Sequence, residues 1–215
     1  MTTEPGELIH TRSYDTQVFL RDEAHLVVRG VLRDTKPPGM YVADDPDSLD
    51  IHEMHVELLV GIANLEILEA TATMQTHPNE TCPSINDDYT ALVGLSIARG
   101  FNRKVRELFG GPRGCAHVTT LLQAMAPAVM QSLWSVEVRR NRVEGLPAGR
   151  SSKRGDDHPG FATNLNTCHV WSEDGDHVAA IRAGAPILIP LPISNRLKKL
   201  GRGGDDWRDP ADTTD

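Results

Sequence analysis

The stretch His-Glu-Met-His-Val-Glu-Leu-Leu-Val, residues 52–60, decides the fold class because polar and apolar side chains alternate along it. The even-numbered positions begin with a histidine and are apolar thereafter; they are His52, Met54, Val56, Leu58 and Val60. The other parity carries the polar residues Glu53, His55 and Glu57. Successive side chains of a strand point to opposite faces, so this period of two predicts a β-strand with one covered face.

The flanking segments extend this strand to an antiparallel sheet. Residues 65–74 return after a turn near residues 61–64 and complete one predicted hairpin. Residues 10–36 contain a second alternating pair, interrupted by the polar residues 21–23, and predict another hairpin. Four strands in two hairpins are typical of an antiparallel sheet that is covered on one face.

Helical patterns follow the strands. Residues 85–98 predict a weak helix, for which Ser84 or Asn86 is a suitable cap. Residues 102–109 predict a short basic amphipathic helix, and residues 115–139 predict the longest helix, with an apolar stripe at helical spacing. The spacing of apolar residues therefore changes from the period of two of a strand to the period of a helix after the last predicted strand.

The last third of the chain has weaker patterns. Residues 145–160 are rich in Gly, Pro, Ser and charge and predict a flexible loop. Residues 167–172 and 177–181 flank a turn-like acidic segment and predict a small hairpin. We therefore expect an α+β fold, in which helices cover a sheet of two hairpins and a small C-terminal β appendix follows. One domain would span residues 9–181, and residues 182–215 would form a largely irregular tail.

Composition narrows the classes of function. The chain has 215 residues, 39% of them hydrophobic, which suits one domain with a core of its own. The net charge of −8 argues against nucleic-acid partners and against charge-driven membrane binding. The polar N-terminus and the three cysteines indicate the cytoplasm. We expect a protein that acts on a small molecule, and an exposed sheet edge would allow a homodimer.

The histidines and one aspartate are candidate functional residues. His52 shares the parity of the covered face, so it is a candidate ligand or acid/base group, with a hydrogen-bonded histidine at the core edge as the alternative. His55 has the opposite parity and is expected to face water. His10 begins the first strand. Asp34 and Lys36 close the first hairpin and would either serve an anionic substrate or form an ion pair across the turn.

The cysteines add a second set of candidates. Cys115 precedes the longest helix, whose N-terminus favours a thiolate, and His117 would share its site if Cys115 lies at or before the cap. A small buried residue at a helix start is the alternative interpretation. Cys82 lies in a loop before a predicted helix, and Cys168 is followed by a histidine. Thiolates with imidazoles suit zinc or iron, although no Cys-x-x-Cys pair is present.

Several motifs together resemble a bacterial family known chiefly as a domain of unknown function. They lie between about residues 9 and 180, and they are Ile9-His10-Thr11-Arg12, Leu32-Arg33-Asp34-Thr35-Lys36, Ile51-His52-Glu53-Met54, Cys82-Pro83, Val105-Arg106-Glu107-Leu108-Phe109-Gly110-Gly111, Gly114-Cys115-Ala116-His117 and Cys168-His169. This resemblance implies an association with aromatic-compound catabolism.

The run from residue 54 to residue 82 also resembles the sheet and first helix of NifU-like iron–sulfur scaffold proteins. In that family a cysteine follows two strands, and a later cysteine beside a histidine begins another helix. The resemblance implies that Cys82 and Cys115 are the counterparts, with His117 displaced from the family's position and Cys168 as a third thiolate. It also implies a NifU-like fold and a metal pocket.

These observations lead to three hypotheses. The first is a lyase that decarboxylates a small aromatic or carboxylate substrate, or removes a small fragment from it, with the catalytic residues His10, Asp34, His52 and His117. A divalent zinc or iron ion would be bound by His52, Cys82, Cys115 and His117. No nucleotide cofactor is expected, because the motifs that bind one are lacking. The second is a NifU-like iron–sulfur or zinc carrier, and the third is a non-catalytic binding domain.

Overall fold

The computed structural model describes residues 6–98, 100–149, 161, 164–185, 188–204 and 207. The chain divides into two compact units, Met1–Ser132 and Leu133–Asp215. The division falls within one long helix, and each unit is described by itself below. The expected domain limits, residues 9–181, stay a prediction.

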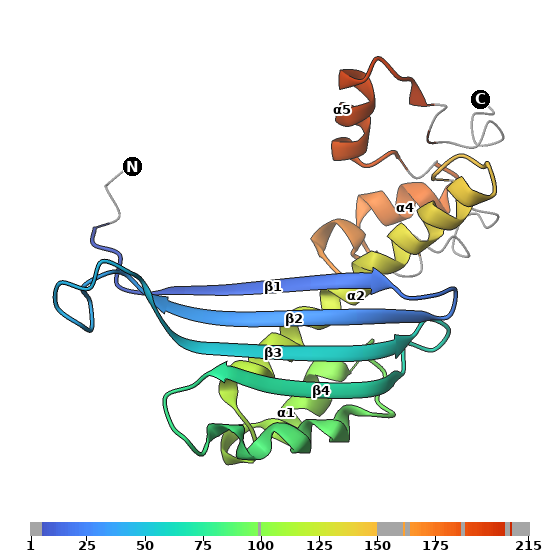
Figure 1. Ribbon diagram of the computed structural model, residues 1–215. Helices are drawn as coiled ribbons and strands as arrows, with labels where there is room; N and C mark the ends of the chain where they lie inside the picture. The colour runs from blue at the N-terminus through green and yellow to red at the C-terminus, as the bar shows by residue number, and fades with distance from the viewer. Residues whose placement is uncertain are drawn as a thin grey trace. The chain divides into compact units, whose positions relative to one another are not determined.

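The first unit is built on a four-stranded antiparallel sheet with the strand order β1-β2-β3-β4 (Figure 1). The strands are β1 (Thr11–Leu20), β2 (His25–Lys36), β3 (Leu49–Gly61) and β4 (Ile67–Thr76). The two predicted hairpins and the antiparallel α+β class are confirmed. The alternation of apolar and polar residues was sufficient for this prediction because only one sheet face is covered.

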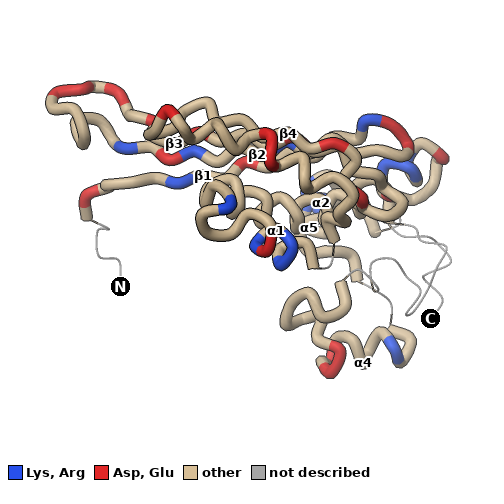
Figure 2. The backbone as a smooth tube through the Cα atoms, turned by 90° about the horizontal axis from the view of Figure 1, so that it is seen from below, with Lys and Arg blue, Asp and Glu red and all other residues tan. Residues whose placement is uncertain are grey.

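The covered face carries the core of this unit. Leu32, Met54 and Leu58 are fully buried on it. The helix α1 and the part of α2 that belongs to this unit lie on this one side of the sheet (Figure 2). Gly30 marks the closest approach, because a Cβ atom there would lie 2.5 Å from the sulfur of Met125. The first half of α2 therefore packs closely against β2 at Gly30, where the strand has no side chain.

Three segments connect the sheet to the long helix. They are the 3-10 helix η1 (Cys82–Leu92), the helix α1 (Phe101–Phe109) and the 3-10 helix η2 (Gly111–Arg113). Helix α1 and the long helix α2 (Ala116–Val143) confirm the two strongest helical predictions. The helix predicted for residues 85–98 is wrong. Tyr89 and Leu92 are buried three residues apart, which fits a 3-10 turn, and the residues that follow pair with the start of β4.

The second unit contains, besides the end of α2, the elements η4 (His169–Trp171), α4 (Asp176–Arg182) and α5 (Leu191–Lys199). The hairpin predicted for this part, and with it the C-terminal β appendix, is wrong. Val178 and Ile181 are buried together with Phe161, and their spacing of three residues is helical. The acidic turn that suggested a hairpin instead precedes a helix. Most of the loop predicted for residues 145–160 lies outside the described residues.

Within the described ranges, no helix combines the length and the apolar character needed to cross a membrane.

Candidate functional site

A row of polar residues crosses three strands at one end of the covered face. Arg12 of β1 pairs with Asp34 of β2, and Asp34 pairs in turn with His52 of β3. Asp34 has the same parity as the buried Leu32, and His52 has the same parity as the buried Met54. The strand register therefore places a carboxylate, a guanidinium and an imidazole side by side on the face that bears the core.

Asp34 is the centre of this row and is only 1% exposed. Arg12 donates two hydrogen bonds to it, one to each carboxylate oxygen, both 2.6 Å long. Nε2 of His10 lies 3.3 Å from Oδ1, and Nδ1 of His52 lies 3.1 Å from Oδ2. Nε2 of His117 lies 3.2 Å from the same Oδ2. Arg12 and His52 therefore make three hydrogen bonds to the carboxylate, and His10 and His117 lie within ion-pair distance of it.

His117 enters the site from the opposite layer, in the first turn of α2. Its ring stacks on that of His52 with 3.9 Å between the ring centres. Its Nδ1 lies 3.6 Å from the sulfur of Cys115, the residue that precedes the helix. The backbone N–H of Cys115 donates to the hydroxyl of Tyr89, which is buried in η1. The sheet and the helix start thus meet at a stacked imidazole pair.

The electrostatics of the cluster favour an ionised Asp34 and a neutral His117. The hydrogen bonds from Arg12 lower the pKa of Asp34 to about 2, against the opposing effect of burial. Burial lowers the pKa of His117, and the nearby His52 and Arg12 lower it further. At neutral pH the cluster therefore combines a carboxylate and a guanidinium with a His117 that is free to accept a proton.

The lowered pKa values of Asp34 and His117 predict that the folded chain loses stability in acid. The pKa of Asp34 is lower in the folded chain, so its contribution of about 2 kcal/mol is present above about pH 4 and is lost towards pH 2. The lowered pKa of His117 likewise gives stability that is present above about pH 6.5 and is lost below it. Urea unfolding from pH 7.5 to 3 should show both losses. The earlier loss should be absent in His117→Asn, and an unchanged profile in that variant would contradict the assignment.

The predicted catalytic residues lie together in the structure. His10, Asp34, His52 and His117 form one cluster, and Cys115 contacts it through His117. The predicted orientation of His52 is confirmed, with 17% of its side chain exposed. His55 contacts Glu53 on the opposite face, and its side chain is 40% exposed.

The two other predicted cysteines and the predicted turn lie elsewhere. Cys82 begins η1, and Cys168 is exposed in the second unit. Among the described residues neither belongs to a group of three or more potential metal ligands. Asp34 does not pair with Lys36 across the turn. Its bonds go to the neighbouring strands instead, because its side chain faces the core.

Arg12 and Tyr89 are the site residues that the sequence analysis did not single out. Arg12 lies opposite Asp34 because Leu20 pairs with Leu26 across residues 21–25. The polar residues 21–23 taken as the whole turn would have placed Arg12 opposite Leu32, so the hairpin pattern alone did not reveal it. Tyr89 carries no sequence signal either, because its contact with Cys115 depends on the path of η1. Burial raises the pKa of Tyr89 to about 12, so its hydroxyl keeps its proton.

One group of potential metal ligands occurs among the described residues. Ligand atoms of Asp34, His52 and His117 all lie within 4.8 Å of one another. Two imidazoles and a carboxylate suit zinc or iron. However, Arg12 occupies both oxygens of Asp34, and a guanidinium at that distance repels a divalent cation. The predicted ligand set of His52, Cys82, Cys115 and His117 is not assembled as a group, because neither cysteine belongs to this one.

The fold and the cluster define the first unit as an α+β domain with a histidine- and carboxylate-lined site. The chain belongs to the family described as "Protein of unknown function (DUF2889)", whose model matches residues 10–131. The match coincides with the first unit and includes the whole cluster. Neither a curated protein nor a solved structure matches the chain significantly, so the NifU-like resemblance is not confirmed.

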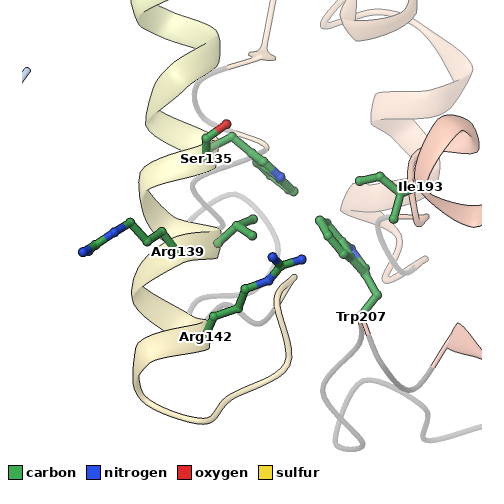
Figure 3. Close-up of a pocket in the computed structure, with 7 residues that line it drawn as sticks. Ser135, Arg139, Arg142, Ile193 and Trp207 are labelled. Atoms are coloured by element: carbon green, nitrogen blue, oxygen red, sulfur yellow. The ribbon is translucent and has the colours of Figure 1, made fainter. Parts of the chain in front are cut away.

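The second unit contains a cavity of about 350 Å³ beyond the matched segment. It is lined by Trp134, Ser135, Val138, Arg139, Arg142, Ile193 and Trp207. In Figure 3, Arg142 extends from α2 towards Trp207, which lies with Ile193 on the opposite wall. Its walls thus combine two indoles with the guanidinium group of Arg142, whereas that of Arg139 points away, and they contain none of the predicted catalytic residues.

Proposed function

We propose that the first unit is an acid/base enzyme, a lyase that decarboxylates a small aromatic or carboxylate substrate or removes a small fragment from it. One observation carries this proposal: three imidazoles and a guanidinium converge on the buried carboxylate of Asp34. Clusters of titratable groups with shifted pKa values are typical of catalytic sites.

A purely structural role accounts poorly for this cluster. Apolar residues would fill the end of a sheet face at least as stably as buried charges do. The imidazoles also remain open to solvent, since the side chains of His52 and His117 are 17% and 21% exposed. The cluster is therefore held by the core and is reachable by a small molecule.

The hydrogen bonds of the cluster indicate which of its histidines can transfer a proton to or from a substrate. His52 donates from Nδ1 to Asp34, so its Nε2 is left with a lone pair that can accept a proton. Asp34 fixes this tautomer and stabilises the imidazolium that forms. The stacked His52 helps to lower the pKa of His117, so His117 stays neutral in this scheme and the proton transfer to the substrate is assigned to His52.

The charge of the site favours a substrate with a carboxylate. About a third of the Arg12 and His10 side chains is exposed beside Asp34, so both donors can meet an anion from solvent. In a decarboxylation, the bond to the carboxylate carbon breaks, its electron pair stays on the substrate carbon, and carbon dioxide leaves. His52, which takes up a proton from water at Nε2 beforehand, then donates that proton to the carbon as an imidazolium and returns to the neutral form. The aromatic part of the substrate rests on the family resemblance alone.

The hydrogen bonds between Arg12 and Asp34 favour a site that binds no metal ion. We expect zinc and iron well below one equivalent in protein purified without a histidine tag, because Arg12 competes for the carboxylate that would bind the ion. Elemental analysis of the full chain and of an Arg12→Gln variant measures this directly. Near-stoichiometric metal in the unmodified chain would contradict the metal-free mechanism and restore a metal-assisted one.

Substrate screening tests the function itself. The full chain is incubated with benzoic, hydroxybenzoic, phenylacetic and cinnamic acids, and loss of the carboxyl group or of a small fragment is followed by nuclear magnetic resonance. Turnover that disappears in an Asp34→Asn variant would support the proposal. If none of these acids is converted by a folded, concentrated sample, the proposed substrate class is wrong.

The carrier hypothesis and the binding hypothesis have less support. A NifU-like carrier needs thiolates that converge, whereas the cluster contains imidazoles and one carboxylate, with Cys115 at its margin. A non-catalytic domain would not require two stacked imidazoles that are partly open to solvent. A brown colour after anaerobic reconstitution with iron and sulfide would favour the carrier.

A further inference from the structure

The proposed acid/base chemistry leaves one reactive group at the site unused, the thiol of Cys115. Its sulfur lies 3.6 Å from Nδ1 of His117, and Nε2 of the same ring lies 3.2 Å from Oδ2 of Asp34. We infer that Cys115, His117 and Asp34 form a thiol–imidazole–carboxylate triad that accepts an acyl group from a thioester or an activated ester. This inference uses the same cluster as the proposed function but does not depend on lyase activity.

The hydrogen-bond directions within the triad are consistent. Nε2 of His117 lies 3.2 Å from Oδ2 of Asp34, and a carboxylate oxygen can only accept, so we assign the ring proton to that nitrogen. Nδ1 is then the basic nitrogen, and it faces the Cys115 thiol. This is the order of roles in a nucleophile–base–carboxylate triad, with the two ring nitrogens exchanged relative to the serine-protease arrangement.

Three further contacts fix the positions of these groups. The carbonyl of Cys115 accepts the N–H of Thr119, which places Cys115 at the cap of α2. The N–H of Cys115 is held by the hydroxyl of Tyr89 at 2.9 Å. His52 stacks on the His117 ring and fixes its plane. The thiol and its base are therefore positioned by buried or half-buried neighbours on both layers.

The other two cysteines lack this environment. In the described part of the chain, neither Cys82 nor Cys168 has a hydrogen bond to an imidazole or a carboxylate, and Cys168 is the more exposed of the two. Exposure alone would make Cys168 the most reactive thiol. The triad predicts the opposite order, so the comparison separates the two explanations.

The acyl transfer balances with groups at the site and water. The sulfur attacks the carbonyl carbon while its proton passes to Nδ1 of His117. The bond to the thiol or alcohol leaving group breaks, and that group takes the proton from His117. Water then hydrolyses the thioester, with His117 again as the base. The first N–H groups of α2, which have no acceptor within the helix, lie at this end and can stabilise the oxyanion.

Alkylation kinetics provide the first test. The folded full chain is treated with iodoacetamide at pH 7.5, and the rate at each cysteine is measured by peptide mass spectrometry. We expect Cys115 to react at least tenfold faster than Cys82 and Cys168. In His117→Asn its rate should fall at least tenfold, while the other two rates, which report on folding, stay within about twofold. Equal rates at all three cysteines, or a fast Cys115 that is indifferent to His117, would overturn the triad.

Acetyl transfer provides the second test. p-Nitrophenyl acetate should give a burst of about one equivalent of nitrophenol and an acetyl group on Cys115, both lost in Cys115→Ser. A His55→Gln variant is the matched control, because His55 lies on the opposite sheet face, and it should retain the burst. No acetyl adduct on Cys115 would overturn the inference. Neither readout requires lyase turnover, so failure of the triad and failure of the proposed function are distinguishable.

Discussion

His52→Gln is expected to lower turnover of any acid converted in the screen by about 10²–10⁴-fold, the usual contribution of a positioned acid or base. Glutamine keeps the polarity and much of the volume of the side chain, and it can still donate to Asp34, but it cannot take up or release the proton. His52 donates from Nδ1 to Asp34 and offers Nε2 to the substrate. The effect should therefore appear in kcat, with a smaller change in KM.

His55→Gln is the matched control for this prediction. His55 lies three residues further along the same strand, faces the opposite side and contacts Glu53 at 2.7 Å. Its replacement should leave kcat within about twofold. Steady-state kinetics of both variants on one substrate decide the question. Equal losses in the two variants would indicate a general effect on folding, and no loss in His52→Gln would show that His52 is not the acid/base group.

The orientation of these histidines was predictable because a strand has a simple period. Residues 53–58 alternate between polar and apolar side chains, so the parity of Met54 and Val56 places His52 on the covered face and His55 on the other. The convergence on Asp34 was not predictable in the same way. Its nearest charged neighbour in the sequence is Arg33, and the partners that matter come from β1, β3 and α2.

Two predictions of secondary structure were wrong, the helix at residues 85–98 and the C-terminal hairpin. Both rested on local sequence patterns, whereas packing against distant residues determines the structure there. Residues 85–98 have a weak helical pattern next to a suitable cap residue, but the chain there forms the 3-10 helix η1, which ends at Leu92, and the residues that follow pair with the start of β4. The acidic turn at residues 173–176 resembles a hairpin turn, but Val178 and Ile181 pack against Phe161 on a helix. In both places the structure depends on contacts with residues that are distant in the sequence, which a local pattern does not show.

Cys82 illustrates a different difficulty. Its position before a predicted helix made it a candidate ligand together with Cys115, because both cysteines precede helical patterns. Similar local positions do not imply proximity in space. Only Cys115 contacts the cluster, and it does so because α2 starts opposite the end of the strands that carries Asp34.

Asp34→Asn is expected to destabilise the chain at pH 7 by about 2–3 kcal/mol. Loss of one partner of a fully buried ion pair costs about 3–5 kcal/mol, and the cost is smaller here because the Arg12 side chain is about a third exposed and can turn to water. The asparagine keeps the shape of the side chain but presents an N–H₂ group towards donors that previously met an oxygen. Urea unfolding at pH 7 measures the difference in unfolding free energy.

Glu57→Gln is the matched control, because Glu57 also pairs with an arginine across neighbouring strands at 2.6 Å. The side chains of Arg29 and Glu57 are 59% and 49% exposed, so their ion pair is screened by solvent and should contribute less than about 0.5 kcal/mol. Both pairs join directly opposed residues of neighbouring strands, but the Asp34 pair is buried and has two hydrogen bonds where the Glu57 pair has one. Equal small losses in both variants would show that the Asp34 cluster does not stabilise the fold, whereas the expected contrast would show that the sheet core holds the carboxylate around which the site is built.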